Sequence, residues 1–119
     1  MGLDIQRLPK KEGIIYNENE GVLYVIGYRN VAKVAKALAS ETRTRIIDLL
    51  RHGPQGLDNI ADEVNQSKAN ISGQIRKLEE IGVVAPIYQP GERGIKKLVE
   101  LKVKAIVLVL DPEKIEKKE

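Results

Sequence analysis

Two short helical patterns, residues 58–64 and 67–81, are separated by only two residues, and this spacing restricts the possible folds more than any other feature. Asp58 can cap the first helix and Ser67 the second, because Asp and Ser side chains accept hydrogen bonds from the first turn of a helix. Apolar residues recur at helical spacing in both patterns. The residues expected to face inward are Ile60, Ala61, Val64, Ile71, Ile75 and Leu78. The first helix is therefore expected to brace the second across an apolar stripe.

A pair of strands follows these helices. Residues 83–88 form a β-branched and aromatic run, residues 89–94 form a turn-rich hexapeptide, and a second run starts at Ile95. From Val99 to Ala105 apolar and charged residues alternate, which is the period of a strand with one face in solvent. A helix, a tight turn, a second helix and a hairpin in this order predict the α+β fold of a winged helix-turn-helix.

The N-terminal part adds a hairpin and two more helices. Residues 1–13 are polar and aperiodic, which predicts a flexible arm. Residues 14–28 hold two β-branched and aromatic runs across a Gly-containing loop, which predicts a β-hairpin. Asn30 and Ser40 are expected to cap the two helices that follow. The apolar stripe expected on the first of them consists of Val31, Val34, Ala35 and Leu38.

An apolar strand and a charged tail follow the wing. Residues 105–110 are apolar at every position, which implies a strand covered on both sides. Residues 22–26 are similar, and we expect the two runs to pair in one sheet that forms or supports a dimer interface; two core strands of a monomer are the alternative. The patterns predict one winged-helix domain over 1–119, with a flexible arm (1–13), an additional N-terminal hairpin (14–28), a helical core (30–82, helix-turn-helix at 58–81), a wing with a C-terminal apolar strand (83–110) and a charged tail (111–119).

The outer face of the helix at 67–81 carries groups that read DNA. Asn and Gln can contact adenine, Lys can reach guanine acceptors or phosphate, and Ser can bond to either. The residues expected to contact DNA on this helix are Lys68, Asn70, Ser72, Gln74 and Lys77, with Arg76 toward one flank. Gly73 costs a helix interior about 1 kcal/mol relative to Ala. It indicates a close approach of the backbone to DNA or to the wing, unless glycine is merely tolerated there.

Positive charge is concentrated in the same part of the chain. The 20 basic and 17 acidic residues give a net charge of only +3. Residues 67–104 hold eight basic and four acidic residues, an excess of +4, whereas the remainder holds 12 basic and 13 acidic residues. A solvated face could explain the charge alone, but together with the helix pair it is typical of nucleic-acid binding. Arg93 at the expected tip of the wing can enter a minor groove, and Lys96 is expected to contact DNA beside it.

Two segments carry a family resemblance. Residues 37–50, ALASETRTRIIDLL, look like the helix that opens the ArsR-type winged-helix repressors, and residues 67–84, SKANISGQIRKLEEIGVV, resemble their recognition helix and first wing strand. The similarity spans roughly residues 31–101 and leaves MarR-like and other archaeal-looking winged-helix regulators open. It implies homodimers that sit on operator DNA and block or modulate transcription. The positions that it implies for DNA contact are Lys68, Ser72, Gln74 and Lys77.

The chain departs from the ArsR pattern in three places. Many members sense metals through cysteines in the short third helix, but residues 56–61 contain none, so we expect no thiolate metal site and no cofactor. A carboxylate and histidine site is conceivable from His52, Asp58, Asp62 and Glu63, although helix capping and surface charge explain these acids more simply. Helices are usual in the family where this chain has residues 14–26 and 105–110. Whether helices or terminal strands form the dimer interface is therefore open.

Composition excludes several other classes of protein. A length of 119 residues fits one domain, and the absence of Cys excludes disulfide scaffolds and thiolate nucleophiles. The longest apolar run is too short to cross a membrane, so we expect a cytoplasmic protein with no membrane partner. No Gly-rich phosphate loop or nucleophile elbow is present, which argues against an enzyme. Four Tyr without Phe or Trp provide no stacking platform for RNA.

Three functions are therefore compared. The first is a homodimeric, sequence-specific regulator that binds double-stranded DNA and represses transcription. The second is a winged helix used for protein contact in a transcription or nucleic-acid-processing assembly, since a fold does not dictate its partner. The third is an architectural DNA binder without sequence preference. A small-molecule effector is not identified; candidate pocket residues are Tyr28, His52 and Tyr88, each with a packing or surface role as the simpler explanation.

Overall fold

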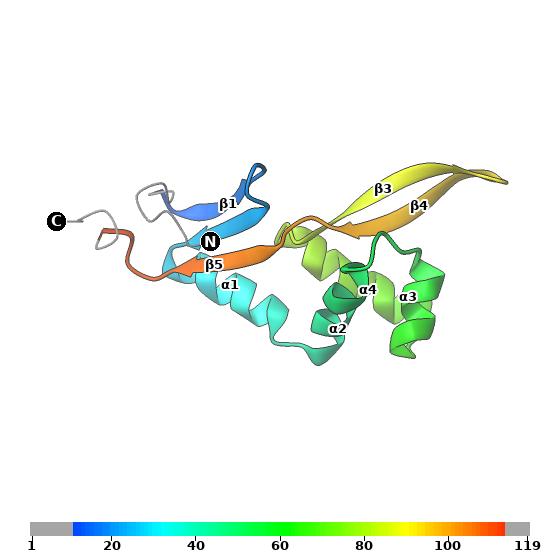
Figure 1. Ribbon diagram of the computed structural model, residues 1–119. Coiled ribbons are helices and arrows are strands. Elements are labelled where there is room, and N and C mark those ends of the chain that lie inside the picture. Colours follow the sequence, from blue (N-terminus) through cyan, green and yellow to red (C-terminus); the bar gives the residue numbers. More distant parts are fainter. Residues whose placement is uncertain (1–10, 114–119) are drawn as a thin grey trace.

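The chain forms a small sheet, a helical unit and a long two-stranded wing (Figure 1). The computed structural model describes residues 11–113. Its elements, in chain order, are β1 (Gly13–Asn17), β2 (Val22–Ile26), α1 (Tyr28–Leu38), α2 (Glu41–Leu50), α3 (Leu57–Val64), α4 (Lys68–Glu80), β3 (Val84–Gly91), β4 (Gly94–Leu101) and β5 (Ala105–Val109). Most of the expected flexible arm and charged tail lies outside the described residues.

The first helix begins earlier than the sequence pattern predicted. Gly27 occupies the N-cap position of α1, so the expectation that Asn30 caps this helix is wrong. The Asn30 side chain instead donates from Nδ2 to the carbonyl oxygen of Ile26, 2.8 Å away, and ties the first turn to the end of β2. The prediction for α2 is confirmed, because the Ser40 hydroxyl accepts a hydrogen bond from the Arg43 amide.

The buried face of α1 also differs from the expected stripe. Val34 is fully buried, and Val31 and Leu38 pack against the same core. Ala35 is exposed, and Ala37 takes its place beside the core. Both alanines neighbour Val34 on a helical wheel, so the pattern could not distinguish them before the packing direction was known.

The strands form two separate sheets. In the first, β2 lies between β1 and β5, with β1 antiparallel and β5 parallel to it. In the second, β3 and β4 pair antiparallel along their whole length and form the wing. The expectation that residues 22–26 and 105–110 share one sheet is therefore confirmed, since Val22 pairs with Ala105 and Ile26 with Val109.

Strand β5 is less covered than expected. Residues 102–104 leave the wing and lead into the other sheet: the Lys102 amide donates to Val83 and the Lys104 amide to Gly21. Leu108 is 43% exposed and Leu110 is 82% exposed. Ile106 and Val107 pack against core residues on opposite faces of the sheet. The prediction that 105–110 is covered on both sides is therefore wrong only for the face that carries Leu108 and Leu110, which no other element within residues 11–113 covers fully.

One core joins the helices to the sheet. It contains Leu23 and Val25 of β2, Ile46 of α2, Ile60 of α3 and Ile71 of α4, all nearly inaccessible to solvent. The molecule measures 58 × 26 × 22 Å, with the three-stranded sheet at one end and the wing tip at the other (Figure 1). Among residues 11–113, no helix is long and apolar enough to cross a membrane.

Candidate nucleic-acid interface

A tight left-handed turn joins α3 to α4. Asn65 has φ 59° and ψ 51°, and its amide bonds to the carbonyl oxygen of Asp62. Ser67 caps α4 as predicted, since its hydroxyl accepts from the Asn70 amide at 3.1 Å. The N-cap of α3 is Gly56, so the prediction that Asp58 caps this helix is wrong. The turn reverses the chain within two residues, which holds α4 across α3.

Asn65 provides a test of this turn. Asn adopts the left-handed conformation more readily than residues with a branched Cβ. Asn65→Val is expected to lower the free energy of unfolding by about 1–2 kcal/mol. A valine side chain at this exposed position would strain the left-handed backbone and would gain no packing in return. Urea denaturation should show this loss, whereas Asn65→Gly should keep nearly the wild-type stability. Equal stabilities for the two variants would contradict this role of the turn.

The buried stripe of α4 decides which of its residues point outward. Ile71, Ile75 and Leu78 are buried, as predicted. With 3.6 residues per turn, the positions opposite them are Ala69, Gly73, Arg76 and Glu80, with Lys77 adjacent. Arg76 thus lies on the outward half of α4, toward the flank that faces the wing, in agreement with the expected position toward one flank.

Asn70 and Gln74 lie on the flank of α4 that faces α2. The Gln74 oxygen accepts a hydrogen bond from Nη1 of Arg43 at 2.6 Å, and Arg43 also donates from Nε to the Ala37 carbonyl at 2.5 Å. Asn70 bonds to Gln66, whose amide donates to the Thr42 hydroxyl at 3.0 Å. Each of the two amide side chains expected to contact adenine therefore has one group bonded within the protein, Gln74 directly to α2 and Asn70 to Gln66, which in turn bonds to α2.

The opposite flank of α4 faces the wing. Ser72 and Arg76 line a groove of about 280 Å³ together with Lys97 and Val99 of β4. Lys97 was not among the residues expected to contact DNA, although its position two residues before the buried Val99 places both on the same face of the strand. The structure thus adds Lys97 to the cations beside α4.

Lys68 is held at the start of α4 by an ion pair. Its Nζ lies 2.8 Å from Oδ1 of Asp58 in α3, and both side chains remain largely exposed. The hydrogen bond to Asp58, followed by the attraction of the same carboxylate, raises the pKa of Lys68 above its ordinary value. Lys68 would have to exchange Asp58 for a phosphate in order to contact DNA.

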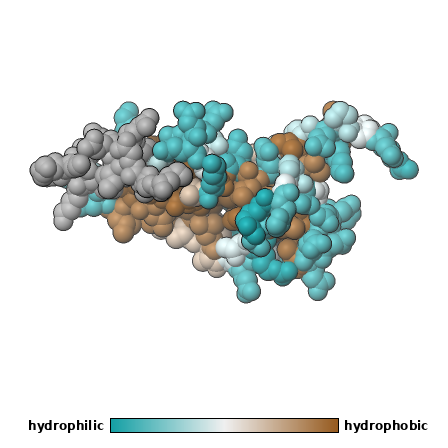
Figure 2. Space-filling model, in the orientation of Figure 1, coloured by the Kyte–Doolittle hydropathy of each residue, from teal (hydrophilic) through white to brown (hydrophobic). Residues whose placement is uncertain are grey.

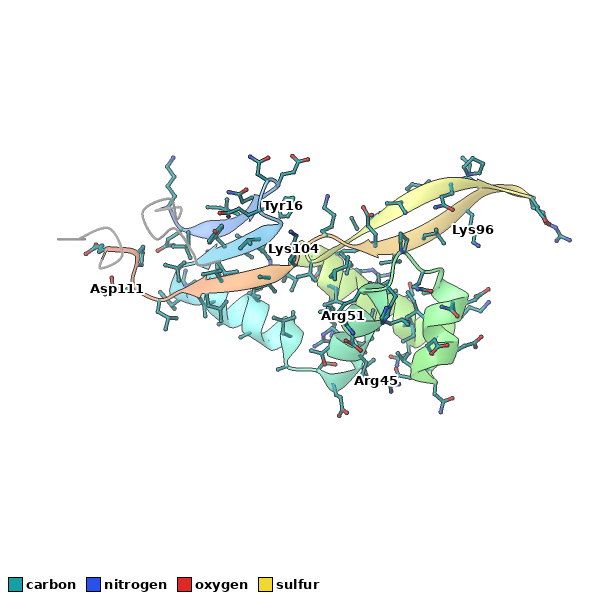
Figure 3. The ribbon with its side chains drawn as sticks, in the orientation of Figure 1. Tyr16, Arg45, Arg51, Lys96, Lys104 and Asp111 are labelled. Atoms are coloured by element: carbon teal, nitrogen blue, oxygen red, sulfur yellow. The ribbon has the colours of Figure 1, made fainter. Side chains whose placement is uncertain are left out.

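The wing carries its cations far from the core. Gly91 pairs with Gly94, so Glu92 and Arg93 form a two-residue turn at the tip, as predicted for Arg93. Lys96 lies opposite Gln89 on the outer part of β4 (Figure 3). Residues 91–97 are all exposed. Neither Arg93 nor Lys96 has an ion-pair partner within residues 11–113, so both are available to phosphates.

Gly73 sits at the middle of the outward face with open space in front of it. A Cβ built at this position would meet no heavy atom within 4 Å. The glycine therefore does not serve close packing against the wing, which was one of the two explanations open from the sequence. Because Gly73 has no side chain, the helix backbone at this position is accessible to a ligand that approaches the outward face of α4.

The residues considered for a metal or effector site do not come together in the part of the chain that the structure describes. No group of three His, Asp or Glu side chains within residues 11–113 could hold a metal ion, and Asp58 pairs with Lys68 instead. Tyr28 and Tyr88 are exposed at 77% and 63% and lie in α1 and the wing, so they share no pocket. A cavity of about 990 Å³ lies elsewhere, with Tyr16, Arg51 and Lys104 among its lining residues (Figure 3).

Comparisons with known proteins agree with this fold. Residues 40–85 match the model of a family described as "Bacterial regulatory protein, arsR family". The solution structure of a homodimeric winged helix-turn-helix DNA-binding domain from Mycobacterium bovis, a possible ArsR-family transcriptional regulator, is 28% identical, with a TM-score of 0.53 over 60% of this chain and 63% of that chain. This chain thus spans just under two thirds of that relative. No curated protein sequence matches the chain.

Two further structures share the fold. The protein Rv0081 of M. tuberculosis is 26% identical, with a TM-score of 0.56 over 64% of this chain and 73% of that chain. An ArsR-like transcriptional regulator from Rhodococcus sp. RHA1 is 24% identical, with a TM-score of 0.53 over 62% and 66%. The fold defines a winged helix-turn-helix protein. More particularly, residues 40–85 are similar to the helix-turn-helix of the arsR family.

Proposed function

We propose that the protein is a homodimeric regulator that binds double-stranded DNA with sequence specificity and represses transcription. The observation that carries this proposal is the outward face of α4, which joins an open backbone at Gly73 to the cations Arg76 and Lys77. The acidic residues of α4 are confined to its last two positions. A helix with such a face can enter the major groove while its buried side rests on α3.

The comparisons supply the remaining support. The arsR-type segment covers the helix-turn-helix, and the similar Mycobacterium bovis domain is described as homodimeric and DNA-binding. The first description names a regulatory protein and the second a DNA-binding domain of a possible transcriptional regulator.

We assign the candidate residues to different tasks. Arg76 and Lys77 would contact bases or phosphates from α4, and Ser72 would contact DNA from the side of the helix near the wing. Arg93 and Lys96 would bind the backbone or minor groove beside the site. Asn70, Gln74 and Lys68, each already bonded within the protein, would orient α4 and contact DNA only after exchanging these partners.

Selection from random duplexes followed by anisotropy titration tests the proposal. We expect a selected duplex to bind at least about 10³-fold more tightly than random duplex. The logarithm of the association constant should fall with the logarithm of salt concentration by about 0.9 per phosphate contact. Equal affinity for all duplexes would favour the architectural alternative. Failure to bind any duplex at low salt would favour the protein-contact alternative.

A further inference from the structure

We propose that two copies of the chain dimerise by pairing their β5 strands antiparallel across a two-fold axis, so that two three-stranded sheets join into one of six strands. This inference deepens the proposed function by assigning the dimer interface. Strand β5 pairs with β2 on one side, and no strand within residues 11–113 pairs with its other side. An open edge of this kind presents unpaired backbone groups that another strand can bind.

The edge lacks the devices that normally prevent such pairing. Residues 105–110 read AIVLVL, without a charge, a proline or a glycine. Soluble proteins usually protect an exposed edge strand with Lys, Pro or a bulge. Hydrophobic residues gather over β5 and the neighbouring α1, whereas the wing and the helices near it are mainly hydrophilic (Figure 2). The unprotected edge therefore fits an apolar strand and not a charged partner.

Strand β5 suits a second copy of this chain better than α1 does. Helix α1 is the other apolar element at this end, but it carries Arg29, Lys33 and Lys36 and no acidic residue. A two-fold contact centred on α1 would bring like charges together, since a two-fold axis places the same patch on both copies. Strand β5 carries no charge, so its self-pairing has no such cost.

The alternation of side chains selects the register. In an antiparallel pair, two residues that lie opposite each other point to the same face of the sheet, whereas neighbours along one strand point to opposite faces. Paired residues must therefore be an even number of positions apart in the sequence. The two-fold axis then passes beside one residue, which pairs with its own copy. An axis through Leu108 pairs it with the Leu108 of the second copy, and pairs Ile106 with Leu110. An axis through Val107 would set Leu110 against Lys104. Because Leu110 is 82% exposed and Leu108 is 43% exposed in the single chain, the axis through Leu108 covers both leucines with apolar partners.

The interface leaves the DNA-binding elements free. The sheet lies at the opposite end of the 58 Å long molecule from the wing tip (Figure 1). Pairing through β5 therefore places two wings at the far ends of the dimer. Each copy could then bind one half of a two-fold symmetric DNA site.

Sedimentation velocity and cysteine cross-linking test this interface. The wild-type chain is expected to sediment as a dimer at micromolar concentration. The Leu110→Glu variant is expected to be a monomer, because dimerisation would bury a charged glutamate of each copy in the β5 interface. Ile95→Glu replaces an equally exposed residue, 79% accessible on the wing, and should remain dimeric. Since the chain has no Cys, Leu108→Cys should form a single disulfide-linked dimer on mild oxidation, whereas Ile95→Cys should not.

Three results would overturn the interface: a monomeric wild-type chain, a dimeric Leu110→Glu variant, or cross-linking through Ala35→Cys of α1 without cross-linking through Leu108→Cys. Anisotropy on the selected duplex separates this inference from the proposed function. A dimer of the expected architecture that binds no DNA would refute only the DNA-binding proposal. DNA binding by a chain that dimerises elsewhere would refute only the β5 interface.

Discussion

Replacing Arg76 and Lys77 together with alanine is expected to weaken binding to the selected duplex about 100-fold, corresponding to about 1.4 kcal/mol for each side chain. Both side chains are exposed on the outward half of α4, and neither has an ion-pair partner within residues 11–113. Their loss therefore removes ligands for DNA without breaking a contact inside the protein. Anisotropy titration at several salt concentrations measures the change, and the salt slope should fall by about 2 if both residues contact phosphate.

The matched control removes the same charge from another helix. Lys33→Ala with Lys36→Ala takes two exposed cations from α1, beside the three-stranded sheet and away from the wing (Figure 1). This variant should bind the duplex nearly as tightly as the wild-type chain. If the two double variants lost affinity equally, net charge and not the face of α4 would account for binding.

The second large effect is expected at Gly73, where stability and affinity should change in opposite directions. Gly73→Ala should raise the free energy of unfolding by about 0.5–1 kcal/mol, because alanine is the better helix former. The added methyl group meets no atom of the protein within 4 Å. The same methyl group would separate the helix backbone from DNA, so affinity for the selected duplex should fall about tenfold, or about 1.4 kcal/mol.

Urea denaturation and anisotropy on the same preparations measure both changes. Ala32→Gly in α1 is the converse control, since this exposed helical position should lose about 1 kcal/mol of stability and keep its DNA affinity. A more stable Gly73→Ala protein with unchanged affinity would mean that glycine is only tolerated at this position, which was the other explanation open from the sequence.

Helix capping shows how far local sequence could predict the structure. Ser40 and Ser67 cap α2 and α4 as expected, because each is followed directly by a helix with the correct apolar spacing. Asn30 and Asp58 have the same chemistry but lie within the first turn of their helices. In both cases a glycine that starts the helix earlier, Gly27 or Gly56, takes the N-cap position. The polar side chain has another partner instead, the Ile26 carbonyl for Asn30 and Lys68 for Asp58.

The elements that carry the candidate site were predicted better than the contacts of their side chains. The helix pair, the wing and the exposed Arg93 at its tip lie where the sequence placed them. The contacts of Gln74 and Lys97 could not be predicted from the sequence. Gln74 is bonded to Arg43, 31 residues away, and Lys97 faces α4 only because β4 packs beside that helix.

The sequence by itself determined the local elements, since the helical and strand periods and the two-residue turn depend on neighbours along the chain. It also determined the concentration of positive charge on α4 and the wing. Only the tertiary structure decided that Asn70 and Gln74 are bonded within the protein and that β5 returns to pair with β2, about 80 residues earlier. It also showed that β5 is an open edge with one face incompletely covered. These features depend on contacts between distant segments, and periodicity within a segment contains no information about which distant segment will cover it.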